Sequence, residues 1–512
     1  MENTYYRPEW TCGRYNKENQ VALMYNLIEG MSYLFEDDSA EVISEILRQE
    51  KNGEISIDEV SSCTSIGKDS LVSFFEDLIH LGLLTTIIPA KEGIDLYRRK
   101  IGLERRENLH FQQTANEDLS IELSDAEKDY FNRVGGVTNV MFELTYNCSE
   151  KCIHCYNPGA IRNDSEKNKR GNRIELELND YYRIIDELYE LGLVKVCLTG
   201  GDPFSKPTVW KIIEYLYKKG IAIEIFTNGQ GILESVERLA MYYPLVVGIS
   251  IYSGIAEEHD QITRIKGSWT RSMKVIEQLA YFGIPLNLKC CIMRLNVRNY
   301  HLVAEIAKKY GAIPQFSVQL INSLDGDICV SNNLRLPTDV LELVLRDNKI
   351  PFYVGKERIN YGAKILTKSP ACESFCITPE GSVQPCCAYP SPFGNLKNTS
   401  FTHILQHSKE LKWWRTIKLS NYNVCGKNNY CCYCRPCPGI NFAETGSPLK
   451  PAKTNCDLAI ARYNLAEKLK QGRDPLNGKS VDKCLSSIVL SVTNLRREFG
   501  DNYLGKKLDI EG

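Results

Sequence analysis

The sequence predicts an α/β protein whose main domain is a parallel sheet of six strand–helix units curved into part of a barrel. Three observations predict this architecture. Strands followed by helices repeat six times between residues 137 and 350, and parallel sheets are built from such units. Residues 1–95 show strands before short helices, and the chain from residue 351 is rich in cysteine where apolar periodicity fades. We therefore expect a partial (β/α)6 TIM-like barrel between a small N-terminal domain and a cysteine-rich C-terminal domain.

The length and composition describe an ordinary globular protein. Of 512 residues, 43% are apolar and 25% are charged, and 62 basic against 64 acidic residues leave a formal net charge of −2. A charge so near zero gives no electrostatic reason to expect binding to nucleic acid or to an anionic membrane. Met1 is followed by a polar stretch rather than a signal sequence, and no apolar run approaches the length of a membrane span. We therefore expect a cytoplasmic protein, with neither nucleic acid nor membrane as its partner.

Residues 1–95 predict a small domain of winged-helix type. Leu23, Tyr25 and Leu27 alternate as in a half-buried strand, and two helices with one apolar face each follow. A DNA-binding role is the alternative, but no dense run of lysine or arginine marks a recognition helix. Residues 96–136 are charged and lack sustained periodicity, which predicts a linker.

Residues 137–350 predict the barrel. One helix of the series carries Val209, Ile212, Ile213 and Leu216 at the i, i+3, i+4 and i+7 spacing of an apolar face. Polar residues that follow the strands of such a sheet share one rim, which is the usual place for a site. The expected strands cover residues 140–146, 194–198, 221–227, 246–251, 286–292 and 316–320.

The 20 cysteines are the anomaly of the composition. A large chain without a signal sequence is expected to keep its thiols reduced, so clustered cysteines favour metal or iron–sulfur binding over disulfides. Residues 351–460 are expected to be loop-rich, with metal sites in place of a hydrophobic core, and residues 461–512 to be a helical tail. Seven cysteines are scattered and are expected to pack as small apolar side chains. The others form three groups: Cys148, Cys152 and Cys155; Cys372, Cys376, Cys386 and Cys387; and Cys425, Cys431, Cys432, Cys434, Cys437 and Cys456.

The first group places three thiolates in the stretch NCSEKCIHCY, directly after the first strand of the barrel. Three thiolates cannot occupy all four corners of a 4Fe–4S cluster, so one iron would stay open to another ligand. The alternative is a zinc knuckle that His154 completes. The spacing by itself leaves both interpretations open.

In its context, this spacing resembles the signature of radical S-adenosylmethionine (radical SAM) enzymes. The following strands end in LTGGDPF, FTNG and GISIYS, and HDQITRIKG comes next; together they resemble that family's motifs over residues 137–322. The resemblance implies a 4Fe–4S cluster on Cys148, Cys152 and Cys155. Two positions depart from the usual pattern, since Asp202 replaces a glutamate and His154 replaces a carbocyclic aromatic. The implied cofactor contacts are backbone groups of Gly200, Gly201 and Asp202, with Thr227, Asn228, Ser250 at the ribose, Arg264 at the carboxylate and His154 beside the adenine.

The second and third groups resemble the long form of the SPASM domain, which holds two auxiliary 4Fe–4S clusters. Cys372, Gly381 and Cys386 match the opening of its pattern. In the later part of the SPASM pattern, which begins here at Cys425, the position of the family's second cysteine is occupied by Asn428. Cys431 or Cys432 is expected to take its place.

The SPASM resemblance also implies two ligand sets. Cys387 and Cys432 are left over, because ten cysteines are available for eight positions. A zinc ribbon is the alternative for this region. One implied set is Cys372, Cys376, Cys386 and Cys437, and the other is Cys425, Cys431, Cys434 and Cys456, with Cys432 as the substitute for Cys431.

The family resemblance implies an enzyme in which a 5′-deoxyadenosyl radical removes a hydrogen from a substrate carbon. The N-terminal domain is similar to the peptide-recognition domains of enzymes that mature ribosomally made peptides, which pair a leader peptide with a strand edge. We therefore expect a radical SAM/SPASM peptide maturase that installs an oxidative crosslink, above all a thioether, in a precursor peptide. The implied cofactors are S-adenosylmethionine and three 4Fe–4S clusters, and an electron donor such as flavodoxin or ferredoxin is the further partner.

Two alternatives remain open at this point. The first keeps the radical chemistry but oxidises a protein residue, as in sulfatase maturation, or a small molecule. The N-terminal domain argues against it. The second is a zinc-binding winged-helix regulator. The sequence identifies no catalytic acid or base, because the position of the substrate is not known.

Overall fold

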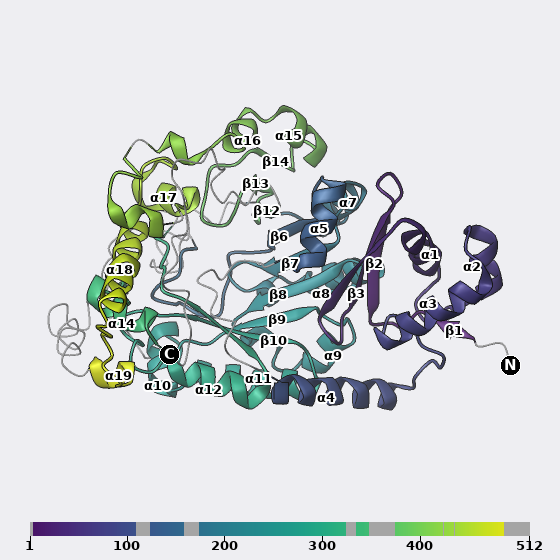
Figure 1. Cartoon of the computed structure of the whole chain (residues 1–512), viewed down its shortest axis with the longest axis horizontal. Helices are drawn as coiled ribbons and strands as arrows, with labels where there is room; N and C mark the ends of the chain where they lie inside the picture. The colour runs from purple at the N-terminus through teal and green to yellow at the C-terminus, as the bar shows by residue number, and fades with distance from the viewer. Residues whose placement is uncertain are drawn as a thin grey trace.

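The computed structural model describes residues 4–108, 123–157, 174–323, 334–347, 374–422, 424–434 and 436–485. Within these ranges the centre is a nine-stranded sheet in the order β11-β10-β9-β8-β7-β6-β12-β13-β14 (Figure 1). The strands β6 to β11 pair in parallel with their neighbours in sequence, which confirms the predicted strand–helix series. They are β6 (Asn139–Glu143), β7 (Lys195–Thr199), β8 (Ala222–Thr227), β9 (Val246–Ser250), β10 (Leu286–Cys291) and β11 (Ile313–Ser317).

The helices between these strands cover the outer face of the sheet. Val196 and Leu198 of β7 are fully buried in the main apolar core beneath them. Lys195 and Cys197 point to the opposite, inner face, because successive side chains of a strand alternate. The helices are α7 (Leu178–Glu190), η2 (Pro203–Ser205), α8 (Val209–Lys218), η3 (Gln230–Ile232), α9 (Val236–Ala240), α10 (Ala256–Thr263), α11 (Ser268–Tyr281), α12 (His301–Tyr310) and α14 (Thr338–Leu345).

The sheet continues into the C-terminal cysteine region, which the sequence does not predict. The first strand of that region adds in parallel to β6 with Cys376 opposite Met141, and two antiparallel strands follow. Ile377 is fully buried in the main core. A region expected to have metal sites in place of a core therefore shares the core of the barrel, because its first strand extends the same sheet. The three strands are β12 (Ser374–Ile377), β13 (Ser382–Gln384) and β14 (Gly394–Asn395).

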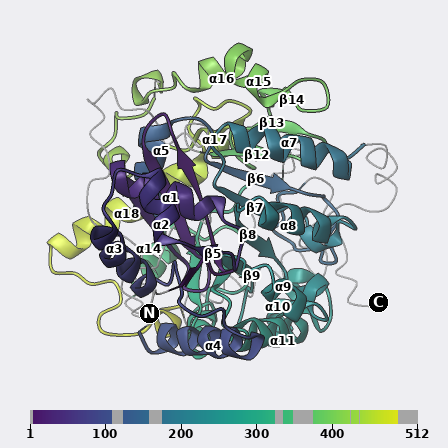
Figure 2. The same cartoon turned by 90° about the vertical axis from the view of Figure 1, so that its right-hand side faces the viewer.

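The N-terminal domain is an antiparallel sheet, β2-β3-β4, with three helices, and it lies in front of the barrel in Figure 2. Met24 in the middle strand packs on the domain's own helices. Leu23 and Tyr25 belong to an apolar cluster with Val194 at the amino-terminal end of β7. The expectation of a half-buried strand is wrong, because the barrel covers the face that an isolated domain would expose. The winged-helix assignment stays a prediction. The elements are β1 (Tyr5–Tyr6), β2 (Thr11–Asn16), β3 (Val21–Asn26), β4 (Met31–Glu36), α1 (Asp37–Arg48), β5 (Glu54–Ile55), α2 (Ile57–Cys63) and α3 (Lys68–His80).

The charged segment expected to be a linker, residues 96–136, contains most of α4 (Lys91–Asn108) and all of α5 (Asp125–Val134). α4 packs against the barrel helices α11 and α12 and lies beside α11 in Figure 2. Its Arg98 donates to Ala240 O at the end of α9, and its Arg105 donates to Gly283 O just after α11. α5 buries Glu127. Apolar periodicity does not reveal these helices, because arginine and glutamate make several of their buried contacts.

A buried ion cluster joins α5 and the N-terminal domain to the barrel. Lys195 Nζ lies 2.8 Å from Glu127 Oε1 and 3.2 Å from Glu224 Oε1. Tyr25 donates its hydroxyl proton to Glu127 Oε1 at 2.8 Å. The N-terminal domain therefore shares polar as well as apolar buried contacts with the barrel.

Beyond the sheet, the C-terminal region is mostly helical. Its helices α17 and α18 lie on the opposite side of the sheet from the N-terminal domain (Figure 1). α18 spans residue 460, so the expected tail begins inside a helix. In the parts of the chain that the structure describes, no helix is long and apolar enough to cross a membrane. The elements are α15 (Phe401–His407), α16 (Lys409–Trp414), η5 (Leu419–Asn421), η6 (Asn429–Tyr433), α17 (Pro438–Thr445), α18 (Lys453–Lys470) and α19 (Val481–Cys484).

Candidate active site and cysteine clusters

The first cysteine group lies in the loop directly after β6, at the carboxyl ends of the parallel strands. The backbone N–H groups of Lys151 and Ile153 donate at 3.0 Å to the carbonyl oxygens of residues 263 and 262, which ties the loop to the end of α10. The described cysteines are free thiols. The thiols that this loop brings together are those of Cys148, Cys152 and Cys155.

The surroundings of these thiols disfavour isolated thiolates. Burial raises the pKa of Cys148 to about 12, and it is the main reason that the pKa of Cys152 lies well above its usual range. A bound metal cluster has the opposite effect on these pKa values, because its positive irons stabilise the thiolates. Two donors already point at Cys148 Sγ, namely Glu150 N at 3.4 Å and Asn228 Nδ2 at 3.3 Å. Hydrogen bonds of this kind tune iron–sulfur clusters.

The donor set fits an iron–sulfur cluster, because cysteine thiolates are the usual ligands of such clusters. His154, which the zinc alternative requires, makes an edge contact with Tyr252 instead, with ring centroids 4.6 Å apart.

Asp202 organises the turns that follow β7 and β8. Its buried Oδ2 accepts hydrogen bonds from Thr227 Oγ1 at 2.5 Å and from Asn228 N at 3.0 Å. Its Oδ1 accepts a third from Phe204 N at 3.0 Å. The carboxylate therefore serves the protein's own donors and holds Thr227 and Asn228 beside the cysteine loop. An aspartate is long enough for this role, because its two oxygens already reach both turns.

Gly200 and Gly201 let the chain after β7 pass closely over the loop after β6. A Cβ on Gly200 would lie 2.3 Å from Thr145 O, and one on Gly201 would lie 2.4 Å from Asn147 O. Gly200 also has φ +132°, which side chains rarely adopt. The N–H groups of Gly201 and Asp202 donate to those same two carbonyls at 2.7 and 2.9 Å. The carbonyl oxygens of Gly200 and Gly201 are the acceptors that the turn can offer an ammonium group, and that of Gly200 also accepts a hydrogen bond from Asn157 Nδ2 at 3.0 Å.

Ser250 and Arg264 lie at the same rim. Ser250 is the last residue of β9, and Arg264 follows α10 with φ +59°, in the left-handed region that few residues other than glycine adopt. The preceding residue accepts a hydrogen bond from Lys151 N, so Arg264 is next to the cysteine loop. An arginine at this position suits an anionic ligand.

Sequence reasoning missed Glu150 and Tyr252. Glu150 Oε2 accepts from Cys152 Sγ at 3.5 Å, its Oε1 has no partner among the described residues, and burial raises the pKa of this carboxyl to about 8. Tyr252 has its hydroxyl oxygen 3.9 Å from Cys152 Sγ and its ring stacked on His259. Their positions in the sequence could have identified them as site residues, because Glu150 lies inside the cysteine motif and Tyr252 comes two residues after Ser250.

Four cysteines of the third group lie near one another. Burial raises the pKa of Cys434 to about 12 and of Cys425 to about 11, and in each case the thiols of the other members add to the effect. Cys432 Sγ donates to Asn429 O at 2.9 Å. The choice of Cys431 rather than Cys432 as the ligand stays a prediction. The four are Cys425, Cys431 and Cys434, in and around η6, and Cys456 in the first turn of α18.

A second neighbourhood forms around Cys376 in β12. Burial is the main reason that its pKa lies well above the usual range, and Glu143, Cys387 and Cys386 contribute. Glu143 is the last residue of β6, and burial raises its pKa to about 7. Cys387, which is left over in the ligand sets implied by the sequence, therefore lies in this neighbourhood.

Cys437 approaches the same neighbourhood from α17. It is the N-cap residue of that helix, and a Cβ on Gly439 in the first turn would lie 3.1 Å from Cys386 Sγ. Cys372, the remaining member of the expected set, lies outside the described residues.

Comparisons with known proteins agree with this arrangement. Residues 142–309 match the radical SAM superfamily, and residues 371–438 match the SPASM iron–sulfur cluster-binding domain. The chain is 28% identical over 325 residues to the antilisterial bacteriocin subtilosin biosynthesis protein AlbA of Bacillus subtilis. The matched region covers 59% of this chain and 67% of that protein. The chain is also 25% identical over 342 residues to an AdoMet-dependent heme synthase of Methanosarcina barkeri. The matched region covers 61% of this chain and 94% of that protein.

A solved structure has a similar fold. The crystal structure of Streptococcus suis SuiB bound to S-adenosylmethionine matches with a TM-score of 0.50 and 13% sequence identity, over 88% of this chain and 99% of that one. At this identity the likeness concerns the fold alone.

Proposed function

This chain is a radical SAM enzyme with a SPASM domain, and we propose that it is a maturase that modifies a ribosomally made precursor peptide. AlbA, a bacteriocin biosynthesis protein, is one of its relatives. The observation that carries the proposal is the presence, in one chain, of the cysteine loop with its rim residues and of an N-terminal sheet whose edge strand β4 pairs with no further strand among the described residues.

The rim residues have separate roles in this proposal. The carbonyl oxygens of Gly200 and Gly201 hold the amino group of S-adenosylmethionine, Arg264 holds its carboxylate, Ser250 its ribose, and His154 borders its adenine. When bound on the first cysteine group, the cluster and S-adenosylmethionine supply a carbon-centred radical that removes a hydrogen from the substrate. The protein's part is to keep one substrate C–H close to that radical and to exclude water.

The two remaining cysteine neighbourhoods are proposed to hold two auxiliary 4Fe–4S clusters, which makes three clusters in all. We further propose a thioether crosslink. A substrate carbon loses a hydrogen atom, a substrate thiol loses a proton, and the S–C bond forms. One electron then remains, which clusters held on the two auxiliary cysteine sets would accept. A reduced donor such as flavodoxin or ferredoxin supplies the electron that starts the reaction. The proposed ligand sets are Cys372, Cys376, Cys386 and Cys437, and Cys425, Cys431, Cys434 and Cys456.

The strand β4 is the proposed binding site for the leader part of the peptide. It is an edge of the β2-β3-β4 sheet, and no further strand among the described residues pairs with it. An extended peptide can add to such an edge through backbone hydrogen bonds. Met31 on this strand is exposed, and residues 32–34 are half-buried. This combination favours a peptide substrate.

A small molecule is the second candidate substrate. The similarity to an AdoMet-dependent heme synthase along 94% of that protein favours it. Such a substrate would not need the β4 edge, and this difference separates the two candidates.

The test uses anaerobically reconstituted protein, S-adenosylmethionine, a reductant and the short peptides encoded beside its gene. The expected result is 5′-deoxyadenosine together with a peptide lighter by two hydrogen atoms. Cofactor cleavage with a porphyrin precursor, and with none of the peptides, would favour the small molecule.

Leader binding is tested by two proline substitutions in β4, Ser32→Pro and Tyr33→Pro. Deleting the domain is unsuitable, because it would uncover Val194 and leave the barrel end exposed. Successive N–H groups of a strand point to opposite sides, so one proline removes a bond to β3 and the other removes an outward donor. The variant that keeps the unfolding temperature of the unaltered protein is the informative one. It should lose peptide turnover at low peptide concentration and regain it at high concentration, and unchanged turnover would contradict leader binding at β4.

A further inference from the structure

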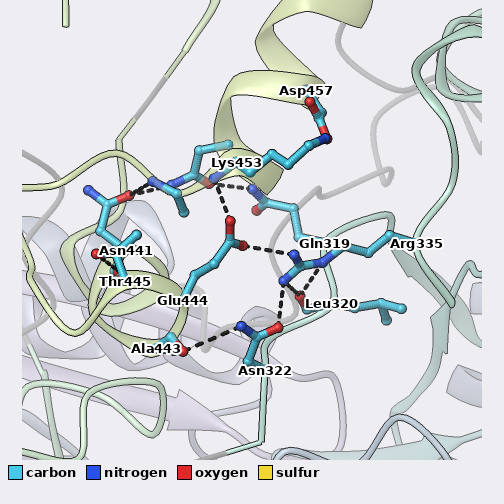
Figure 3. A network of polar contacts seen from close by, with 12 residues as sticks. Gln319, Leu320, Asn322, Arg335, Asn441, Ala443, Glu444, Thr445, Lys453 and Asp457 are labelled. Atoms are coloured by element: carbon cyan, nitrogen blue, oxygen red, sulfur yellow. Dashed lines mark hydrogen bonds and ion pairs between the residues drawn. The ribbon is translucent and has the colours of Figure 1, made fainter. Parts of the chain in front are cut away.

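The N-terminus of α18, which carries Cys456 in its first turn, is capped by residues of another helix. Its N-cap residue is Ala452, whose side chain cannot accept a hydrogen bond. Ala452 N donates instead to Asn441 Oδ1 at 2.9 Å, and Lys453 N donates to Glu444 Oε1 at 2.5 Å. Asn441 and Glu444 belong to α17 (Figure 3), so α17 provides the cap that α18 lacks.

Glu444 is held from its other side by the barrel. Its Oε2 lies 2.8 Å from Arg335 Nη1, and the two side chains are only 13% and 12% exposed. Arg335 Nη2 in turn donates to Leu320 O at 2.8 Å and to Asn322 Oδ1 at 3.0 Å, just beyond the end of β11 (Figure 3). A carboxylate at a helix N-terminus also interacts favourably with the helix dipole. Glu444 therefore connects the end of the last barrel strand to the start of α18.

A second connection reaches the residue next to Cys456. Gln319 Nε2 donates to Asn455 Oδ1 at 2.9 Å, and Asn455 Nδ2 donates to Asn441 Oδ1 at 3.0 Å. Asn441 and Asn455 are buried, so these bonds are shielded from water. Cys434 Sγ lies 4.0 Å from Asn455 O. The segment that carries Cys456 is thus fixed both to the barrel rim and to the thiol of Cys434.

We propose that Glu444, held by Arg335, is a positioning residue for the auxiliary cluster at Cys425, Cys431, Cys434 and Cys456. It fixes the helix that brings Cys456 to the three thiols of the η6 region, and it places a negative charge near the cluster. Charge and hydrogen bonding around an iron–sulfur cluster set its reduction potential. This inference rests on the proposed function, because it requires a cluster at these cysteines.

The test measures the midpoint potentials of the auxiliary clusters in protein whose first cysteine group is changed to alanine, which leaves two clusters to observe. Glu444→Gln keeps the size and one acceptor oxygen but removes the charge. We expect iron to stay at about eight per chain, and the potential of one cluster to become more positive, because the reduced form loses a repulsive neighbour. Arg335→Met should move the same potential in the negative direction, because the Glu444 charge is then no longer neutralised. In Arg335→Lys, the potential of this cluster should lie near its value in the unaltered protein.

The matched control is Asp474→Asn, which removes a similar ion pair beyond the other end of α18. Asp474 Oδ2 lies 2.7 Å from Arg346 Nη2. No shift is expected in this variant. An equal shift in the control, no shift in Glu444→Gln, or shifts of the same sign in Glu444→Gln and Arg335→Met would each overturn the proposal.

Failure of the proposed function gives a different result. If the unaltered protein binds no auxiliary iron, the proposed function fails, and hydrogen exchange then tests the cap. The amide of Lys453 should exchange about tenfold faster in Glu444→Gln, as expected when a charge-assisted hydrogen bond becomes a neutral one, and at the unaltered rate in Asp474→Asn. Unchanged exchange in Glu444→Gln would overturn the cap as well.

Discussion

Two cysteine sites of this protein are built in different ways. The loop site, Cys148, Cys152 and Cys155, comes from one short loop after β6. The two-segment site, Cys425, Cys431, Cys434 and Cys456, joins the η6 region to the first turn of α18. Short-range spacing brings the first set of thiols together. The second set depends on where a helix lies, and that helix is capped by α17 and held by the barrel.

The difference shows where each site can be disturbed. The loop site depends on neighbouring turns, above all on the bonds of Asp202 to Thr227 and Asn228. The two-segment site depends on residues as distant in sequence as Arg335. Changes near one site should therefore leave the other intact, and four predictions, ordered by their expected effect on cofactor cleavage, test this separation.

The largest effect is expected when Cys148, Cys152 and Cys155 are changed together to alanine. Three clusters of four irons give about twelve irons per chain, and this variant should retain about eight. Release of 5′-deoxyadenosine should fall to background, because no open iron remains to bind the cofactor. Iron analysis and chromatography of the reaction measure both quantities. Stoichiometric zinc in the unaltered protein would contradict the cluster assignment.

The next effect is expected for Asp202→Ala. It leaves Thr227 Oγ1 and two backbone N–H groups without their acceptor, and each loss costs about 1–3 kcal/mol. We expect the affinity for S-adenosylmethionine to fall about a hundredfold, with a smaller loss in Asp202→Asn because one oxygen remains. Calorimetry measures the binding. The auxiliary clusters should keep their spectra, and a change there would show that the sites are not independent.

A smaller effect on cofactor cleavage is expected for Cys431→Ala, with Cys432→Ala as its matched control. Cys431 lies among the thiols of the two-segment site, whereas Cys432 donates to Asn429 O. Cys431→Ala should lower iron from about twelve to about eight per chain, leave cofactor cleavage within a few-fold, and stop peptide modification. Cys432→Ala should change none of these. The reverse pattern would make Cys432 the ligand.

The smallest effect is expected far from both sites, at Lys51 in the N-terminal domain. Burial lowers the pKa of Lys51 to about 7, so the folded protein binds this proton more weakly than the unfolded chain does. The lysine therefore destabilises the fold increasingly as the pH falls from about 10 to 7, and by a constant amount below that.

Lys51→Met should raise the unfolding temperature, and by more near pH 7 than near pH 9. The difference corresponds to up to about 2 kcal/mol. Thermal unfolding at the two pH values measures it, and cofactor cleavage should not change. An equal gain at both pH values would mean that Lys51 stays charged in the folded protein.

Local patterns were sufficient for much of the fold and for the loop site. The alternation of Val196 and Leu198 places β7, and the spacing of Ile212 and Leu216 places α8. Three cysteines in one loop are close in space wherever that loop lies. Such features depend on neighbours in sequence, so the sequence by itself determined the six parallel strands and the cysteine loop.

Other features depend on segments that meet only in the folded chain. β3 is buried on both faces because the barrel covers one of them, and β12 joins the barrel sheet although 230 residues, 144–373, separate it from β6. Cys456 on α18 lies near Cys431 of η6, so this group of thiols joins two separate segments. No pattern in the sequence shows that Glu444 caps α18 in place of Ala452. The tertiary structure decided these points, because a buried face, a shared cluster and a cap from another helix each require contacts between residues that are distant along the chain.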